Sequence, residues 1–303
     1  MSAPATADSA APAPAFAGIS NSRKIRNSLA TVAVTAAFLL ALVPLIWVLY
    51  TVFARGFTVI VSAGWWNQSL SGLLGRQQGG GAYHAVYGTL LTGLVCAMLS
   101  VPIGMMVAVY LVEYGGRSRL ARTTTFMVDI LTGVPSIVAA LFIYALWIAI
   151  LGFPRSALAV SFALVLLMVP VVVRATEEML KIVPDELREA SYALGVPKWK
   201  TIMRVVIPTA LSGILSGTML ALARVMGETA PVLVLVAYAP FINYNLLGGN
   251  MATLPLLMTV ERNNPTDAGA DRIWGSALTL IIIIALLGVL ATILSRVFAV
   301  KTK

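Results

Sequence analysis

Residues 29–54 read LATVAVTAAFLLALVPLIWVLYTVFA, and no charged side chain interrupts them. A helix of about 20 apolar residues crosses the ~30 Å hydrocarbon core of a bilayer, so this run is long enough to span a membrane. A barrel strand is excluded, because barrel strands alternate lipid-facing and interior residues whereas this run is apolar throughout. The stretch therefore predicts a membrane-spanning α-helix.

Five further apolar runs follow along the chain. The six predicted spans lie at about 29–54, 85–112, 125–151, 156–173, 207–236 and 273–295. The expected fold is an all-α polytopic membrane protein with six transmembrane helices. An Ala/Pro/Ser-rich tail at 1–22 is expected to be disordered in the cytosol. Residues 23–303 form the transmembrane domain, with a charged cytosolic loop at 174–206.

The composition agrees with a membrane protein and excludes other classes. Of the 303 residues, 59% are hydrophobic and 11% are charged, and the mean hydropathy is +0.91. A soluble chain has about 25% charged residues and could not bury so much apolar surface. The net charge of +9 would suit a nucleic-acid binder, but the basic residues stand between apolar runs and form no patch on a polar surface. The single cysteine, Cys96, excludes an intramolecular disulfide and a cysteine metal site.

The distribution of Lys and Arg predicts the orientation. With a cytosolic N-terminus, fifteen of the 21 basic residues fall on the cytosolic side and five on the outer side. This bias places both termini in the cytosol and makes the chain a multi-pass protein of the cell (inner) membrane. Two long loops are then outer loops: a Gly-rich loop around 79–81, expected to be flexible, and a loop at about 237–272. His84 ends the first of them and is expected to be a solvated loop side chain.

The cytosolic loop 174–206 has the sequence signals of a helical hairpin. Pro184 suits the first position of a helix, the acidic residues after it complement the helix dipole, and Gly195 with Pro197 suits its end. The residues expected on one face of this helix are Leu187, Ala190, Ser191 and Leu194, and those expected opposite are Arg188 and Glu189. Such an amphipathic helix either packs on its own bundle or docks on a partner, and the periodicity alone leaves both open.

Three ionisable side chains lie within the predicted spans: Asp129, Arg224 and Glu228. Each costs at least ~2.5–3.5 kcal/mol to insert, so such charges usually face each other or a water-filled path. Arg224 and Glu228 are four residues apart and are expected on one face of the fifth helix. Either they neutralise each other, or Arg224 presents its five-donor fork to an oxyanion. In the second case Glu228 orients Arg224 and accepts a hydrogen bond from protonated phosphate, which sulfate cannot supply. Asp129 is expected to be an interfacial anchor.

Two features of the spans concern backbone geometry. Pro135 removes a helix hydrogen bond in the third span beside Ser136, so a kink there either lines a translocation path or serves packing alone. Gly213 and Gly217 in the fifth span form a Gly-x-x-x-Gly pair, which permits close helix contact but is also common in any membrane helix.

Several motifs resemble those of known transport families. The run Glu189-Ala190-Ser191, then Gly195, then Val205-Val206-Ile207-Pro208 resembles the EAA loop of ABC importer permeases, with conservative departures at three positions. Residues 223–231, ARVMGETAP, resemble the Ala-Arg-x-x-Gly-Glu-Thr-Ala-Pro signature of phosphate-specific permeases. Gly133-Val134-Pro135-Ser136 and residues 173–178 match the same family. Across most of 83–297 the chain is similar to the A-type permeases of the Pst phosphate importers.

The resemblance implies a type I ABC importer permease fold and the function of a permease subunit in an ATP-driven phosphate importer. In that family the EAA loop is the coupling helix that inserts into the ATPase. The residues that this implies for ATPase coupling are Glu189, Ala190, Gly195, Leu187 and Leu194, and those for the substrate path are Arg224, Glu228, Pro135 and Ser136. The implied partners are a C-type permease, an ATPase dimer, an external phosphate-binding protein and phosphate itself.

The chain lacks the Gly-x-x-x-x-Gly-Lys-Ser/Thr loop that binds nucleotide phosphates. ATP hydrolysis is therefore expected on a separate subunit, and this chain is expected to be no enzyme, with no cofactor and no catalytic or metal-binding residues. Three alternatives stay open: a permease for another oxyanion such as sulfate or molybdate, a carrier or channel that works without an ATPase, and a phosphate-sensing scaffold.

Overall fold

The computed structural model describes residues 20–298, without the side chain of Phe298, and every regular element in that range is a helix. The chain divides into two compact units, 1–51 and 52–303, which are described separately. The predicted tail at 1–22 lies mostly outside the described residues, and its last two residues, Asn21 and Ser22, already belong to the first helix.

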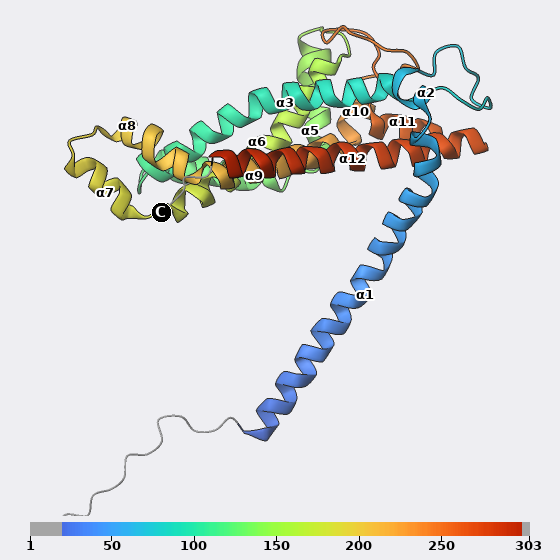
Figure 1. Ribbon diagram of the computed structural model, residues 1–303. Coiled ribbons are helices and arrows are strands. Elements are labelled where there is room, and N and C mark those ends of the chain that lie inside the picture. Colours follow the sequence, from blue (N-terminus) through green and yellow to red (C-terminus); the bar gives the residue numbers. More distant parts are fainter. Residues whose placement is uncertain (1–19, 299–303) are drawn as a thin grey trace, which may run out of the picture. The chain divides into compact units, whose positions relative to one another are not determined.

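The described part of the first unit is a single helical segment. It belongs to α1, Asn21–Ile60, which starts here and continues into the second unit (Figure 1). Its large apolar side chains are exposed within the unit, Leu40 to 73% and Trp47 to 72%. The apolar side chains are exposed on all sides of this helix, which would be unfavourable in water. A helix of this length and composition is therefore expected to lie in lipid.

The second unit holds the remaining helices (Figure 1). In chain order they are α2 Ala63–Asn67, α3 Tyr83–Val109, the π-helical turn η1 Tyr110–Tyr114, α4 Arg119–Thr132, α5 Ser136–Ile143, the π-helical segment η2 Tyr144–Ile150, α6 Ala157–Ile182, α7 Asp185–Ala193, α8 Lys198–Thr201, η3 Ile202–Val206, α9 Ile207–Met226, α10 Ala230–Leu235, α11 Leu254–Glu261 and α12 Asp267–Phe298. Among residues 20–298, five helical stretches are long and apolar enough to cross a membrane, and the bent pair α4 and α5–η2 would be a sixth. The predicted all-α polytopic fold is thus confirmed.

Two of the predicted spans are not continuous helices. The third turns by 105° between α4 and α5, so the expectation of a kink within one helix is wrong. Pro135 stands before α5 with extended backbone, φ −59° and ψ 138°, and it has no N–H with which to continue α4. The fifth stops at Met226, with Gly227 as its C-cap, and helix resumes only at Ala230. The fourth, in contrast, continues beyond the predicted end to Ile182.

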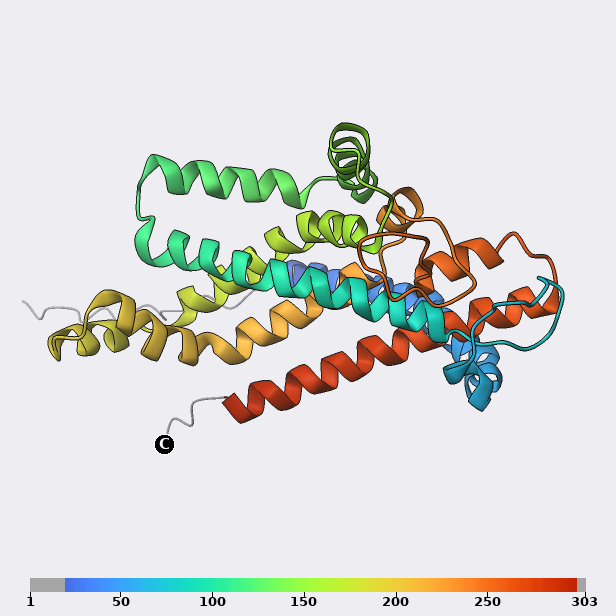
Figure 2. The ribbon, with the colours of Figure 1, turned by 90° about the horizontal axis from the view of Figure 1, so that it is seen from above.

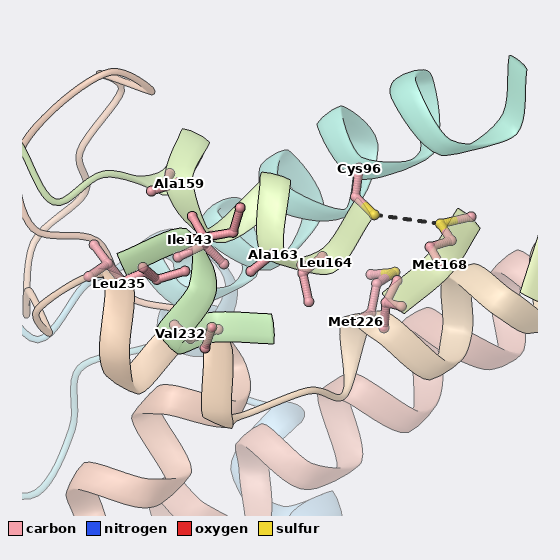
Figure 3. Packing of buried hydrophobic residues seen from close by; sticks show 14 of the residues in the cluster. Cys96, Ile143, Ala159, Ala163, Leu164, Met168, Met226, Val232 and Leu235 are labelled. Carbon is pink, nitrogen blue, oxygen red and sulfur yellow. Dashed lines mark hydrogen bonds between the residues drawn. The ribbon is translucent and has the colours of Figure 1, made fainter. Parts of the chain in front are cut away.

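The core of the second unit is built on α6, which packs between α3 and α9, while α12 packs on α9 (Figure 2). Small residues let these helices approach closely: a Cβ added to Gly217 of α9 would lie 2.6 Å from the Cβ of Ala175 on α6. The Gly213/Gly217 pair therefore lies where α9 packs closely against α6. The surrounding cluster includes Cys96, fully buried, with its Sγ 3.6 Å from the Sδ of Met168 (Figure 3).

The two predicted outer loops pack against the helices. Residues Met251, Leu254 and Leu257 are buried, and the backbone N–H of Leu254 donates to Thr89 Oγ1 on α3 at 2.8 Å. The Gly-rich loop is held by Arg272 of α12, which donates to the carbonyl of Gln77 at 2.7 Å. Arg272 also forms a buried ion pair with Glu261 of α11, 3.3 Å between Nη1 and Oε1.

The expectation for His84 is wrong. His84 is not a solvated loop residue: it lies in the first turn of α3 and is 1% exposed, and its Nε2 is 3.5 Å from the hydroxyl of Tyr238. The polar, Gly-rich composition before His84 suggested a loop, but α3 already begins at Tyr83. The chain between α10 and α11 covers the first turn of α3, and loop composition does not reveal such a tertiary contact.

Candidate functional site

Both helix breaks open onto one cavity of about 290 Å³. The residues that line it are Leu131, Thr132, Gly133, Val134, Pro135 and Ser136 from the α4–α5 break, Leu167 and Val171 from α6, and Arg224 and Glu228 from the end of α9. The fold therefore brings together the four residues predicted for a substrate path, although Pro135 and Ser136 lie about 90 positions before Arg224 and Glu228 in the sequence. Their role in transport stays a prediction.

Arg224 belongs to the last turn of α9 and is exposed at the cavity. Within the described residues no carboxylate forms an ion pair with it. Mutual neutralisation by Glu228 is therefore absent from this conformation. The N–H donors of Arg224 are therefore available to an anion that enters the cavity, whose lining also includes the carboxylate of Glu228.

Glu228 is not on α9, contrary to the expectation that it shares a helical face with Arg224. The helix ends at Met226, and the N–H of Glu228 donates to the carbonyl of Val225 at 3.1 Å, in the turn that follows. Glu228 is half-buried and reaches the cavity because the chain leaves the helix there. The spacing of four residues correctly predicted that Arg224 and Glu228 lie near one another, but the two residues do not share a helical face.

From the other helix break, Ser136 is the first residue of α5, and Pro135 directly precedes it. The first N–H groups of a helix have no partner within the helix and carry the positive end of its dipole. The cavity thus has a guanidinium and a helix N-terminus among its walls, and both favour a negatively charged ligand. Leu131, Val134, Leu167 and Val171 supply the apolar part of a lining that is mostly polar.

The wall formed by α4 is connected to α6 by an ion pair. Asp129, one turn before the cavity residues, pairs with Arg174 of α6. Arg174 also pairs with Glu177 at 2.6 Å, and Glu177 with Lys181 at 2.9 Å. The sequence predicts that Asp129 is an interfacial anchor. In the structure it is joined to Arg174 of the neighbouring helix α6.

A second candidate region is the helical hairpin of α7 and α8. The helix, Gly turn and helix predicted from the sequence are present, and Gly195 makes the turn with φ +77°, which strongly favours glycine. Ser191 faces inward, 2.8 Å from Thr201 Oγ1 on α8. Leu187, Glu189, Ala190 and Leu194 are exposed, Leu194 to 83%. The expectation that Ser191 shares a face with the two leucines is therefore wrong: Ser191 is on the side that packs inward, whereas Leu187 and Leu194 are not buried on the bundle.

Arg188 is expected on the face of α7 opposite the leucines, and its side chain points into the protein. Its side chain is 12% exposed and pairs with Glu113 of η1, which is 5% exposed. Neither Glu113 nor the reach of Arg188 was found from the sequence. The available signal was the position of Glu113, a lone acid directly after a long apolar run.

Comparisons with known proteins agree with this arrangement. Residues 100–303 match the family described as "Binding-protein-dependent transport system inner membrane component". The chain is 60% identical over 272 residues to the phosphate transport system permease protein PstA 1 of Mycobacterium tuberculosis, covering 90% of this chain and 89% of that one. It is 37% identical over 272 residues to the phosphate transport system permease protein PstA of Yersinia pestis, covering 90% of each.

Two solved transporters share the fold at low sequence identity. A chain of the inward-facing MetNI methionine ABC transporter has a TM-score of 0.57 at 18% identity, covering 72% of this chain and 94% of that one. A chain of a bacterial ABC transporter that imports alginate has a TM-score of 0.61 at 11% identity, covering 93% and 99%.

Proposed function

Because the chain belongs to the binding-protein-dependent transport system inner membrane components and, among them, to the phosphate transport permeases, we propose that it forms half of the translocation path of a phosphate importer. It is a permease subunit of a phosphate ABC importer with the type I permease fold, and a multi-pass protein of the inner membrane. The other half of the path comes from a C-type permease, and an external binding protein delivers phosphate.

The observation that supports a substrate role is the position of Arg224. A guanidinium within a span needs compensation for its cost of insertion, and in the described residues no carboxylate supplies it. Phosphate oxygens match the parallel N–H donors of arginine, and the N-terminus of α5, which lines the same cavity, adds a favourable dipole. Phosphate therefore passes through the cavity at the two helix breaks, bound transiently by Arg224 and by Ser136 with its neighbouring backbone N–H groups.

Glu228→Gln tests the discrimination between phosphate and sulfate. Near neutral pH phosphate retains a proton that it can donate to a carboxylate, whereas sulfate has none and is repelled. The amide removes the repulsion and adds an N–H donor, so sulfate should compete with phosphate uptake roughly tenfold more strongly. Competition by sulfate is measured in cells, with Glu178→Gln as the control, because Glu178 is an exposed carboxylate on α6 that does not line the cavity. Unchanged sulfate competition by Glu228→Gln would rule out this hydrogen bond.

The exposed face of α7 fits a separate ATPase. Leu187 and Leu194 are solvent-accessible leucines on a short, well-terminated helix, the kind of surface that enters a groove on a partner. Glu189 and Ala190 belong to the same exposed region, and Gly195 sets the turn that presents it. The ATPase dimer binds and hydrolyses ATP, so this chain carries no cofactor and is no enzyme.

The end of the second unit that holds α7 and α8 faces the cytosol in this proposal. The concentration of Lys and Arg in and around loop 174–206 supports this orientation. The loops at 60–82 and 237–266 then lie on the outer side. Both termini are then cytosolic.

Removal of the ATPase subunit is the experiment that tests the proposed function. Cells that contain this chain, the C-type permease and the binding protein should take up labelled phosphate only when the ATPase is also present. The matched control is an ATPase subunit that assembles but cannot hydrolyse ATP, which should leave uptake equally low. Uptake that persists without the ATPase would show an ATPase-independent carrier, and faster uptake of sulfate or molybdate would show another oxyanion permease.

A further inference from the structure

The side chain of Arg188 uses every hydrogen-bond donor it has. Its Nε and Nη2 donate to Glu113 Oε1 at 3.1 and 2.9 Å, and Nη2 also donates to the carbonyl of Leu180 at 3.0 Å. Its Nη1 donates to the carbonyl of Val183 at 2.7 Å and to Asp185 Oδ1 at 3.1 Å. A guanidinium has five N–H groups, so all of them are occupied.

These acceptors come from three different elements. Glu113 belongs to η1, the π-helical end of α3, while Leu180 and Val183 supply carbonyls from the last turn of α6 and its C-cap. Asp185 is on α7 itself. Arg188 thus joins α7 to the ends of α3 and α6 through a pair that is almost completely excluded from solvent.

The other arm of the hairpin is attached to the same point. Lys198, the first residue of α8, donates to the carbonyl of Glu113, and its Nζ lies 4.9 Å from the ring centre of Tyr114. The turn η1 therefore holds both α7 and α8, while Leu187 and Leu194 remain exposed. A displacement of the exposed face cannot occur without either moving η1 and the end of α6 or breaking these contacts.

We propose that Arg188 and Glu113 are positioning residues that transmit the displacement of α7 to α3 and α6, and hence to the cavity. This rests on the proposed function, in which the ATPase displaces α7. From α6 the connection continues through Arg174 to Asp129 of α4, one turn before Thr132 at the cavity wall. The pair thus couples ATP hydrolysis to transport and contributes little to ATPase docking, because Arg188 is turned away from the exposed face.

The test measures phosphate uptake and ATP hydrolysis in parallel on the complete importer in proteoliposomes. Arg188→Lys keeps the charge but has three donors in place of five, and Glu113→Gln keeps the side-chain size but loses the charge. In both variants the ATPase should stay bound and hydrolyse ATP, while phosphate imported per ATP falls about tenfold. The double variant should be no worse than either single one, because the pair acts as a unit. Arg204→Gln, an exposed basic residue on η3, is the control and should keep the wild-type ratio.

Two results would overturn the proposal: an unchanged ratio of phosphate to ATP in both variants, or loss of the ATPase from the complex in proportion to the loss of uptake. The second would assign the pair to docking. If Arg188→Lys does not assemble, Glu113→Gln decides. Failure of the proposed function has a separate signature, which is wild-type uptake without the ATPase subunit.

Discussion

Arg224→Gln is expected to reduce phosphate uptake to background while the importer still assembles. Glutamine is polar but shorter and uncharged, so the cavity between the two helix breaks loses its cation. Two charge-assisted hydrogen bonds contribute roughly 1.5–3 kcal/mol each, so their loss slows uptake at least about 100-fold. Folding should be unaffected, because Arg224 is exposed at the cavity and none of its side-chain atoms is in an ion pair among the described residues.

The measurement is initial uptake of labelled phosphate, with co-purification of the partner subunits as the check on assembly. Arg262→Gln is the matched control, since Arg262 is also an exposed arginine without an ion pair in the described part but lies after α11 and away from the cavity. Arg224→Lys should be intermediate, because lysine keeps the charge but not the planar fork. Wild-type uptake by Arg224→Gln would refute a role for Arg224 in the substrate path.

The double substitution Leu187→Asp/Leu194→Asp should abolish both ATPase binding and phosphate uptake. These side chains are 40% and 83% exposed, so the fold of the permease does not depend on them. In an interface each would bury its apolar surface, and complete burial of a leucine side chain contributes about 1.5–3 kcal/mol. Replacing both with a charge should weaken docking by more than about 100-fold, because burying an unpaired carboxylate is added to the lost contact.

Co-purification of the ATPase with the tagged permease measures docking directly. The matched control is Leu74→Asp, which introduces the same change at a leucine that is 70% exposed in the Gly-rich loop. Normal ATPase recovery with the double variant would show that the ATPase binds elsewhere. A loss of the C-type permease as well would show instead that the substitutions disturb the membrane complex.

The sequence predicted the helical class because apolar runs long enough to span a bilayer are a property of the local sequence. Arg224 and Glu228 were identified for a similar reason, since a charge in an apolar run is conspicuous. Their geometry was not predictable, because helical spacing assumes that the helix continues, and Gly227 ends it. The approach of Pro135 and Ser136 to Arg224 depends on the 105° turn between α4 and α5, whose direction no local pattern contains.

Arg188 illustrates a different limit. Periodicity placed it on a polar face, but Arg188 and the buried Ser191 are three residues apart and share the side of α7 that packs inward. Its partner Glu113 is 75 residues away in the sequence and is brought close only by the packing of α3 on α6. His84 and Tyr238 are 154 residues apart and were missed for the same reason.

The burial of Cys96 gives the wild-type chain an unreactive thiol background. It is the only cysteine in the sequence, it is 0% exposed, and its sulfur faces Met168 inside the helix core. Water-soluble alkylating reagents should therefore leave the native chain unmodified. Cysteines introduced at Ser136 or Thr132 would then be the sole labelled positions, so their alkylation from either side of the membrane, with and without ATP, would report the access of the cavity without prior removal of Cys96.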